Sequence, residues 1–416
     1  GTQDFLGTEI LKLRYIEKIA ANIANNFGFN EIKTPIFENT EVFVRLGDES
    51  DIVTKEMYTF FDKGNRSITL RPEGTAAVVR SFLENKLYAN NLPLTKLYYF
   101  GPMFRYERPQ AGRYREFHQF GVEVFGKSTA LLDCDVIISA YQILKKLKID
   151  NFVLKINSIG DYESRKLYSD TLQSYFKEHL NDLCDDCKRR IEKNPLRILD
   201  CKVDNNNPIL LNAPKIHDFL NQSSKQYFQE VLSILNQFNI PYEVDEKLVR
   251  GLDYYTDTVF EFIINSQDDL NGIAICGGGK YAELVKSFNG MDIPGIGYAM
   301  GVERLIAIMD IQNKWDGLIN NDLDVLIISL DYESKLKALE IAHLLRDNNL
   351  KTEIDYENIT MKQQFKLADK LNPKFILIIG EEERQKGVVS IKDTNTKTQE
   401  RVANSDIITY LKGKLL

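Results

Sequence analysis

The sequence predicts an α+β domain built on an antiparallel sheet flanked by helices, with a helical insertion and a C-terminal α/β domain. Three observations support this prediction. Two β-rich runs flank an arginine-rich loop within 104–126, the segment 163–228 is charged and helical in pattern, and strands alternate with helices from 324 onwards. We therefore expect a first domain over 1–320 with its insertion at 163–228, and a second domain over 324–416.

The composition is typical of a globular protein of more than one domain, with 416 residues of which 43% are hydrophobic. Its 53 basic and 60 acidic side chains give a net charge of −7, so any contact with nucleic acid must be local rather than chain-wide. No charged leader precedes an apolar core, and no apolar run approaches the ~20 residues of a membrane span. We expect a cytoplasmic protein.

The N-terminal elements follow from periodicity. Apolar residues recur at helical spacing over 8–27, and Gly28 is a natural stop. The segment EIKTPIFEN is typical of a strand interrupted by Pro35, which is best tolerated at an edge or an interface. The segment SITLRPEGT (67–75) predicts a strand that runs into a helix near Gly74.

The arginine-rich loop predicts a long antiparallel hairpin, because Pro109 and Gly112 supply turn residues between two β-rich runs. The remaining predicted elements of the first domain are a helix at 131–149 and strands at 152–158, 259–264 and 273–281, then a glycine-rich stretch and helix over 293–309. In the second domain, LDVLIISL, KTEIDY and FILIIG are predicted strands, and helices are predicted at 333–348, 361–371 and 405–413.

The five cysteines fit a reducing compartment and argue against a disulfide framework. Cys184 and Cys187 form a CxxC, with Cys201 downstream and His179 upstream, so a structural zinc has to be considered. The second half of the usual paired-ligand spacing is missing. The simpler interpretation is that free thiols lie on an amphipathic helix, and no side chain is assigned to a metal.

Arg105 and Glu107 are the first pair of candidate site residues. At strand spacing both side chains point to one face, where a cation and a carboxylate suit a ligand with a phosphate and a donor-bearing base. A cross-strand salt bridge is the structural alternative. Arg108, Gln110 and Arg113 at the hairpin tip suit contacts with a nucleic-acid backbone or base edge, or form a solvated turn.

Two further clusters strengthen the interpretation. LVRGLDYYTDTVFEF mixes Arg250, Asp253, Tyr254 and Tyr255, which a plain core strand avoids burying without partners. CGGGKYAELV allows close backbone approach to a ligand, although glycine triplets are often only turns. GIGYAMGVERL places Glu303 and Arg304 on a helix after small residues.

Together these clusters resemble the three motifs of class II aminoacyl-tRNA synthetases: the proline-bearing helix and strand at 8–38, the FRYE hairpin at 104–126 and GIGYAMGVERL at 295–305. LVRGLDYYT and GGGKYAELV resemble the signature peptides of histidyl-tRNA synthetases, and GTQDFL and TLRPEGT match that family too. The resemblance covers essentially the whole chain. It implies the class II synthetase fold and a reaction in which histidine and ATP give histidyl-adenylate, from which histidine passes to its tRNA.

The resemblance implies roles for the arginines. Arg105 would bind the α-phosphate, Arg304 the ATP tail and the adenine face, and Glu107 and Arg113 also belong to the ATP site. Arg250 would lie near the histidine carboxylate and compensate the charge that builds during adenylation, which depends on positioning and electrostatics. The family uses Mg²⁺, held largely through the ATP phosphates.

The resemblance assigns histidine binding to Glu73, Thr75, Gln119, Glu123, Tyr254 and Tyr255. Glu123 and Tyr255 would address the two ring nitrogens of the imidazole, which offer one donor and one acceptor. Arg108 and Gln110 would approach the acceptor end of the tRNA, and 324–416 would be the anticodon-binding domain. Pro35 belongs to a dimer interface in this class, so a homodimer is implied.

Three alternatives stay open. A non-catalytic, synthetase-like regulatory subunit of ATP phosphoribosyltransferase shares the core, but such proteins lack the C-terminal domain and usually lose RGLDYYT. Another class II enzyme, for threonine or proline, shares the hairpin and a similar C-terminal domain. A binding or signalling protein that keeps the fold without turnover is the third.

Overall fold

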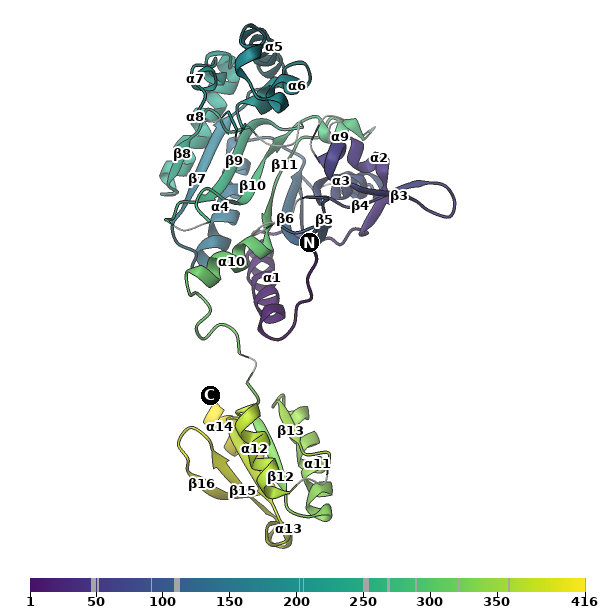
Figure 1. The fold of residues 1–416 in the computed structure, drawn as a ribbon, viewed down its shortest axis with the longest axis vertical. Coiled ribbons are helices and arrows are strands. Elements are labelled where there is room, and N and C mark those ends of the chain that lie inside the picture. Colours follow the sequence, from purple (N-terminus) through teal and green to yellow (C-terminus); the bar gives the residue numbers. More distant parts are fainter. Residues whose placement is uncertain are drawn as a thin grey trace. The chain divides into compact units, whose positions relative to one another are not determined.

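The computed structural model describes residues 1–45, 50, 52–90, 92–107, 113–201, 203–204, 206–249, 254–267, 270–288, 290–320, 322–357 and 360–415. Three predicted site residues, Arg108, Gln110 and Arg250, lie outside these described residues. The chain divides into two compact units, Gly1–Ile319 and Asn320–Leu416, and each has its own sheet and core (Figure 1).

The first unit is built on an eight-stranded sheet of order β1-β5-β6-β11-β10-β9-β7-β8. From β5 to β7 the neighbours are antiparallel, whereas the edge strands β1 and β8 pair in parallel with β5 and β7. The predicted hairpin is confirmed as β5 and β6. The strands are β1 (Asn30–Glu31), β5 (Thr95–Phe104), β6 (Glu116–Phe125), β7 (Phe152–Ser158), β8 (Tyr242–Val244), β9 (Thr256–Ile264), β10 (Ala274–Tyr281) and β11 (Gly295–Gly301).

Four helices cover one face of this sheet: α1 (Thr8–Asn26), α4 (Ala130–Lys146), α8 (Gln222–Gln237) and α10 (Val302–Ile311). The apolar stripe of α1 buries Leu13, Ile16 and Ala20, as its spacing predicts. Thr129 begins α4, because its side chain accepts a hydrogen bond from the backbone N–H of Leu132. This face holds the largest apolar core of the chain's described part.

The opposite face carries a smaller layer (Figure 1). It consists of α2 (Thr40–Val44), α3 (Thr75–Glu84), α9 (Leu284–Ser287), a π-helical turn (Ile52–Glu56), a 3₁₀ turn (Leu87–Ala89) and a three-stranded sheet of β2 (Phe37–Asn39), β4 (Ser67–Leu70) and β3 (Tyr58–Phe61). The predicted strand-to-helix transition at Gly74 is confirmed. EIKTPIFEN is not one interrupted strand, however: Pro35 separates β1 from β2, which belong to different sheets.

Side chains alternate on the central strands in a way that prepares a binding surface. On β11, Ile296, Tyr298 and Met300 enter the helix-covered core. The other face of β11 bears only small residues, namely Gly295, Gly297, Ala299 and Gly301. The register places Gly297 opposite Glu123 and Gly301 opposite Gln119 on β6. Polar side chains of β6 therefore border a floor that is nearly free of side chains.

The predicted helical insertion contains α5 (Tyr162–Glu178), α6 (Asp185–Lys193), α7 (Pro208–Leu211) and the 3₁₀ turns Leu180–Asp182, Pro195–Ile198 and Ile216–Asp218. Residues from Tyr168 to Leu220, joined by Val249, form a separate apolar core. Phe228, Val231 and Leu235 of α8 instead pack into the main core. We propose that the insertion ends before α8, near 221, rather than at 228.

The second unit has a five-stranded mixed sheet of order β13-β12-β14-β15-β16. The parallel part matches the predicted strand–helix alternation. The hairpin of β15 and β16 lies between the third predicted strand and the predicted helix at 405–413, and the strand–helix alternation does not indicate it. The elements are β12 (Val325–Ser329), α11 (Tyr332–Asp347), β13 (Thr352–Ile354), α12 (Met361–Leu371), β14 (Phe375–Ile379), α13 (Glu381–Lys386), β15 (Val388–Asp393), β16 (Gln399–Ala403) and α14 (Ile407–Leu415).

Among the helices in the described ranges, none combines the length and the apolar character that a membrane span requires.

Candidate active site

Two adjoining cavities lie on the small-residue floor of the main sheet. The arginine cavity is lined by Arg105, Glu107, Arg113, Tyr114, Phe117, Gln119, Ala274, Ile275, Cys276, Gly277, Ala299, Gly301, Glu303 and Arg304. The glutamate cavity is lined by Glu73, Thr75, Tyr99, Arg105, Gln119, Glu123, Tyr254, Tyr255, Gly277, Tyr281, Gly297, Tyr298 and Ala299. Four residues line both cavities: Arg105, Gln119, Gly277 and Ala299. The two cavities therefore form one continuous site.

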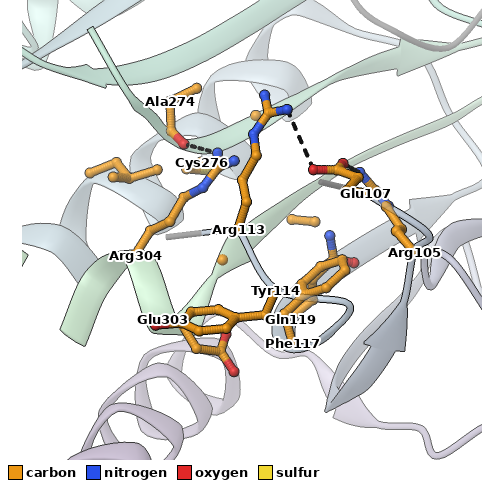
Figure 2. A pocket seen from close by; sticks show the side chains of 14 residues that line it. Arg105, Glu107, Arg113, Tyr114, Phe117, Gln119, Ala274, Cys276, Glu303 and Arg304 are labelled. Carbon is orange, nitrogen blue, oxygen red and sulfur yellow. Dashed lines mark hydrogen bonds and ion pairs between the residues drawn. The ribbon is translucent and has the colours of Figure 1, made fainter. Parts of the chain in front are cut away.

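Three guanidinium groups and two carboxylates face the arginine cavity (Figure 2). The Glu107 carboxylate lies 3.4 Å from Arg113 Nη1 and 3.9 Å from Arg105 Nη1. The Nε of Arg105 donates to the Pro72 carbonyl oxygen at 2.8 Å, which fixes the guanidinium plane. Arg304 Nη1 donates to the Ala274 carbonyl oxygen at 2.6 Å. Backbone carbonyls thus hold two of the cations in place.

The proximity of Arg105 and Glu107 has a different cause from the one predicted. β5 ends at Phe104, and the backbone N–H of Glu107 bonds to the Arg105 carbonyl oxygen at 2.8 Å. The chain therefore turns between the two residues, so strand alternation does not bring them together. Their side chains still meet at the cavity wall, so the prediction that they lie on one side holds.

The guanidinium groups of this cavity lie close enough to repel one another, although Glu107 and Glu261 offset part of the charge on Arg304. Burial lowers the pKa of the Arg304 guanidinium, and the neighbouring cations Arg113 and Arg105 lower it further. One of the two carboxylates, Glu303, is already engaged: it accepts from the backbone N–H of His118 at 2.9 Å and contacts His118 Nδ1 at 2.9 Å. Clustered cations beside donors of fixed geometry form a site for a polyanion such as a phosphate chain.

Glu123 dominates the glutamate cavity. Its carboxyl group accepts hydrogen bonds from Thr75 Oγ1 at 2.6 Å and from Tyr281 Oη at 2.6 Å. Its side chain is 1% exposed. Burial raises the pKa of Glu123 to about 8, against the lowering effect of these two hydrogen bonds. Burial therefore shifts this carboxyl group towards its neutral form.

Gly297 makes room for this carboxyl group. A Cβ atom at this position would collide with Glu123 Oε2 and with the carbonyl oxygen of Val122. Because the Val122 oxygen belongs to the paired strand β6, neither obstacle can move without disturbing the sheet. Glycine at 297 is thus a requirement of the close approach between β11 and Glu123.

Glu73 is held at the beginning of α3. Its carboxylate accepts from the backbone N–H groups of Thr75 and Ala76, both at 2.8 Å. Burial raises the pKa of Glu73, while these two bonds oppose the shift. The positive end of the α3 dipole adds to the same stabilisation. Glu73 is therefore a rigid, buried acidic group that faces the cavity.

Gln119 supplies an unsatisfied acceptor. Its Oε1 atom is buried and has no hydrogen-bond partner among the described residues. Buried polar atoms of native proteins are almost always paired, so an unpaired one in a cavity wall calls for a ligand. Because Gln119 lines both cavities, a donor bound at their junction would satisfy it.

The structure brings the described predicted site residues together in two groups. Arg105, Glu107, Arg113 and Arg304 line the arginine cavity, whereas Glu73, Thr75, Gln119, Glu123, Tyr254 and Tyr255 line the glutamate cavity. Arg250, Arg108 and Gln110 lie outside the described residues. Their assigned roles stay predictions.

The sequence patterns did not single out Tyr281 or His118, and they placed Glu303 on a helix without a role. Tyr281 ends the GGGKY peptide and bonds to Glu123, but the two residues are 158 positions apart. A signal existed, since Gly277, Gly279 and Tyr281 alternate on one strand and share a face. The bond between Glu303 and His118 joins α10 to β6 and had no signal in the sequence.

The comparisons with known proteins bear directly on this site. The model of the family described as "Histidyl-tRNA synthetase" matches residues 1–305, which is more than half of the chain. The chain belongs to the histidyl-tRNA synthetase family. A second family model, "Anticodon binding domain", matches residues 324–414.

Individual relatives of the histidyl-tRNA synthetase family agree with this assignment. The chain is 46% identical over 419 residues to a histidine–tRNA ligase of Geobacillus sp. (100% of this chain, 98% of the relative), and 45% identical over 414 residues to that of Bacillus subtilis (99% and 97%). The crystal structure of Staphylococcus aureus histidyl-tRNA synthetase matches with a TM-score of 0.84 and 38% identity, covering 99% of this chain and 98% of that chain. The regulatory-subunit alternative is not favoured.

Proposed function

We infer that this chain is a histidine–tRNA ligase, which activates histidine with ATP to histidyl-adenylate and transfers histidine to the 3′-terminal ribose of its tRNA. One observation carries the assignment to this site. A cavity built around the buried carboxyl group of Glu123 opens into a cavity lined by three arginines. An amino acid with a proton-accepting side chain suits the first cavity, and a nucleoside triphosphate suits the second.

We propose that histidine occupies the glutamate cavity with its ring towards Glu123. The carboxyl group and a tyrosine hydroxyl, from Tyr255 or Tyr281, offer a donor and an acceptor to the two ring nitrogens. Glu73 and the unpaired Oε1 of Gln119 then accept from the α-ammonium group. An apolar amino acid would leave these buried groups without partners, which disfavours its binding by orders of magnitude.

ATP is proposed to occupy the arginine cavity. Arg105 lines both cavities and is assigned to the α-phosphate, next to the histidine carboxylate, while Arg113 and Arg304 contact the rest of the nucleotide. A carboxylate oxygen of histidine attacks the α-phosphorus, and the bond to the β-phosphate breaks to release pyrophosphate. The arginines align two anions and compensate their repulsion. Arg250 is proposed to share this role, and Glu107 to contact the adenine.

Mg²⁺ is proposed as the companion of ATP. The phosphate oxygens of ATP would hold most of this ion, which prefers oxygen donors and keeps several of its waters, and no side chain is assigned to it. When bound, the ion would neutralise part of the charge on the triphosphate.

The tRNA is proposed to contact both units. The unit Asn320–Leu416 is assigned to the anticodon, supported by its family match. Arg108 and Gln110 are assigned to the acceptor end, on the strength of their place at the hairpin tip. A cytoplasmic location is proposed because the five cysteines, none of which forms a disulfide, fit a reducing compartment.

The assignment is tested by exchange of labelled pyrophosphate into ATP with the full chain. We expect histidine to support exchange, and threonine and proline to give only background. Exchange with threonine or proline instead would place the chain among other class II enzymes. No exchange with any of the three would leave a protein that keeps the fold without adenylation.

We further propose that the chain forms a homodimer through the segment that follows Pro35. Phe37 on β2 and Phe60 and Phe61 on β3 are 59%, 47% and 70% exposed. Phe37 and Phe60 share one face of this small sheet, whereas Phe61 lies on the other. Exposed aromatic side chains that lie together on one face mark an interaction surface. Their position beside Pro35 agrees with the interface expected from the resemblance.

Phe37→Asp is predicted to raise the dimer dissociation constant by about tenfold to a hundredfold, because it removes an aromatic ring that the proposed interface would bury and adds a charge there. Sedimentation equilibrium over a concentration series measures this constant. Phe238→Asp is the matched control, since Phe238 is 57% exposed at the end of α8 and distant in sequence from Pro35. A monomeric wild type, or an equal effect of both substitutions, would contradict the proposed interface.

A further inference from the structure

Three cysteines and an aspartate converge in the helical insertion. Cys184, Cys187, Cys201 and Asp204 each offer one ligand atom, and these four atoms all lie within 4.8 Å of one another. Cys184 immediately precedes α6, Cys187 lies in its first turn, and the other two follow the 3₁₀ turn Pro195–Ile198. Two chain segments therefore contribute two ligand atoms each, in the pattern C-x₂-C and C-x₂-D.

The distances suit a tetrahedral ion. Sulfur atoms bound to one zinc lie about 3.8 Å apart, the edge of a tetrahedron whose Zn–S bonds are ~2.3 Å long. Cys184 Sγ and Cys201 Sγ are 3.7 Å apart, and Cys201 Sγ lies 3.9 Å from Asp204 Oδ2. A disulfide between Cys184 and Cys201 would need these sulfurs at ~2.05 Å, and it would leave Cys187 and Asp204 without a role.

The backbone holds the four ligands in position. The N–H of Cys184 donates to Asp204 Oδ2 at 3.0 Å, and the N–H of Asp204 donates to Cys201 Sγ at 3.5 Å. Such outer hydrogen bonds orient ligand atoms and stabilise their negative charge. Each segment is therefore tied to a ligand atom before any ion binds.

The site is enclosed, as expected for a structural ion. Cys187, Cys201 and Asp204 are 0%, 6% and 9% exposed. A carboxylate buried among sulfur atoms is costly unless a cation or strong donors compensate its charge. The surrounding core, from Tyr168 to Leu220, belongs to a small helical lobe, and lobes of this size often depend on a metal or disulfides.

We propose that Cys184, Cys187, Cys201 and Asp204 bind one Zn²⁺ ion that stabilises the helical insertion. Three thiolates favour zinc over the hard cations Mg²⁺ and Ca²⁺, and four protein ligands leave no open position for catalysis. Binding releases the thiol protons to solvent. The sequence spacing argued against this site because the second pair of metal ligands was incomplete. Asp204 completes that pair. His179 is not part of the group, and its ring packs on Tyr175 at 5.0 Å.

Metal analysis of the full chain tests the proposal without any substitution. Protein purified without a metal-affinity tag is expected to contain about one zinc per chain by plasma mass spectrometry. Replacement by Co²⁺ is expected to produce thiolate-to-cobalt charge-transfer bands and the visible bands of a tetrahedral ion. The proposal would be overturned if the protein, supplied with each metal under reducing conditions, bound neither zinc nor cobalt. A disulfide between Cys184 and Cys201 in place of the ion would also overturn it.

Two substitutions locate the ion. Cys187→Ser is expected to lose most of the zinc and to lower the melting temperature. Cys134→Ser is the matched control, because Cys134 is equally buried but lies in α4, outside this cluster. If Cys187→Ser fails to fold, Asp204→Cys serves instead, and its cobalt complex should show stronger charge-transfer absorption from a fourth thiolate. Full zinc content in Cys187→Ser, or unchanged cobalt bands in Asp204→Cys, would refute this ligand set.

Discussion

Replacement of Arg105 by alanine is expected to lower the rate of histidine-dependent pyrophosphate exchange by about a hundredfold to a thousandfold, the usual effect of removing one fixed donor from a developing charge. Among the described residues that line both cavities, Arg105 is the one that carries a charge. In the proposed complex it therefore lies where the histidine carboxylate and the α-phosphate approach one another. The loss should fall mainly on kcat, because the interaction strengthens as the new bond forms.

Two further variants separate this role from a structural one. Arg105→Lys keeps the charge, but one ammonium group cannot both bond to the Pro72 carbonyl oxygen and present a planar pair of donors, so a substantial loss is still expected. Arg66→Ala is the control, because Arg66 pairs with Asp62 at the surface and its side chain is 75% exposed. Near-normal exchange by a folded Arg105→Ala variant would remove Arg105 from the mechanism.

Glu123→Gln is expected to lower kcat/KM for histidine by about tenfold to a hundredfold, the value of one hydrogen bond to a charged partner. Glutamine matches the shape of glutamate and keeps one acceptor and one donor for Thr75 and Tyr281. It cannot pass a proton to the imidazole or become a carboxylate beside it. Steady-state kinetics with histidine varied measure the effect. Glu84→Gln is the control, because Glu84 ends α3 and its side chain is 63% exposed.

The same substitution should change how stability depends on pH. Because burial raises the pKa of Glu123 to about 8, the folded protein binds more protons than the unfolded chain between about 4.5 and 8. This stabilising contribution is complete below the unfolded pKa and is lost as pH rises through 8. The melting temperature of the ligand-free wild type should thus fall across this window, and that of Glu123→Gln should fall less.

Other buried acids also titrate, so the comparison between the two proteins matters. The pKa of Glu73 is raised by burial, and that of Asp133 is raised to about 6. Both groups are present in the wild type and in Glu123→Gln, and the difference between the two melting curves isolates Glu123. Parallel pH profiles of the two proteins would contradict a protonated Glu123.

Local patterns in the sequence were enough to predict most of the first unit. Alternation defined β5 and β6, and helical spacing defined α1, because each side chain's burial depends on its near neighbours in the chain. The contact between Tyr281 and Glu123 depends instead on the register of β10, β11 and β6, which only the folded sheet sets. Asp204 reaches the cysteines through a turn whose course no periodicity reveals.

The hairpin of β15 and β16 could not be predicted from the sequence, for a related reason. Its turn is fixed by the Asp393 side chain, which accepts from the backbone N–H groups of Asn395 and Thr396 at 2.8 and 3.0 Å. The strand–helix alternation before it was the stronger pattern. It led correctly to the helix at 405–413, which is α14, but gave no sign of the hairpin that precedes this helix. The resemblance also gave roles to residues within 108–112 and 250–253, and these roles stay predictions.

The small residues on β11 also carry an entropic cost. Each glycine in a strand interior costs roughly 0.5–1 kcal/mol relative to alanine, because the unfolded chain gains freedom there. Gly295, Gly297 and Gly301 gain no side-chain packing in return. The strand is therefore stabilised by Ile296, Tyr298 and Met300 on its other face. Residues that keep this strand folded thus alternate along the chain with residues that leave space for substrates. Selection can therefore act on each set separately.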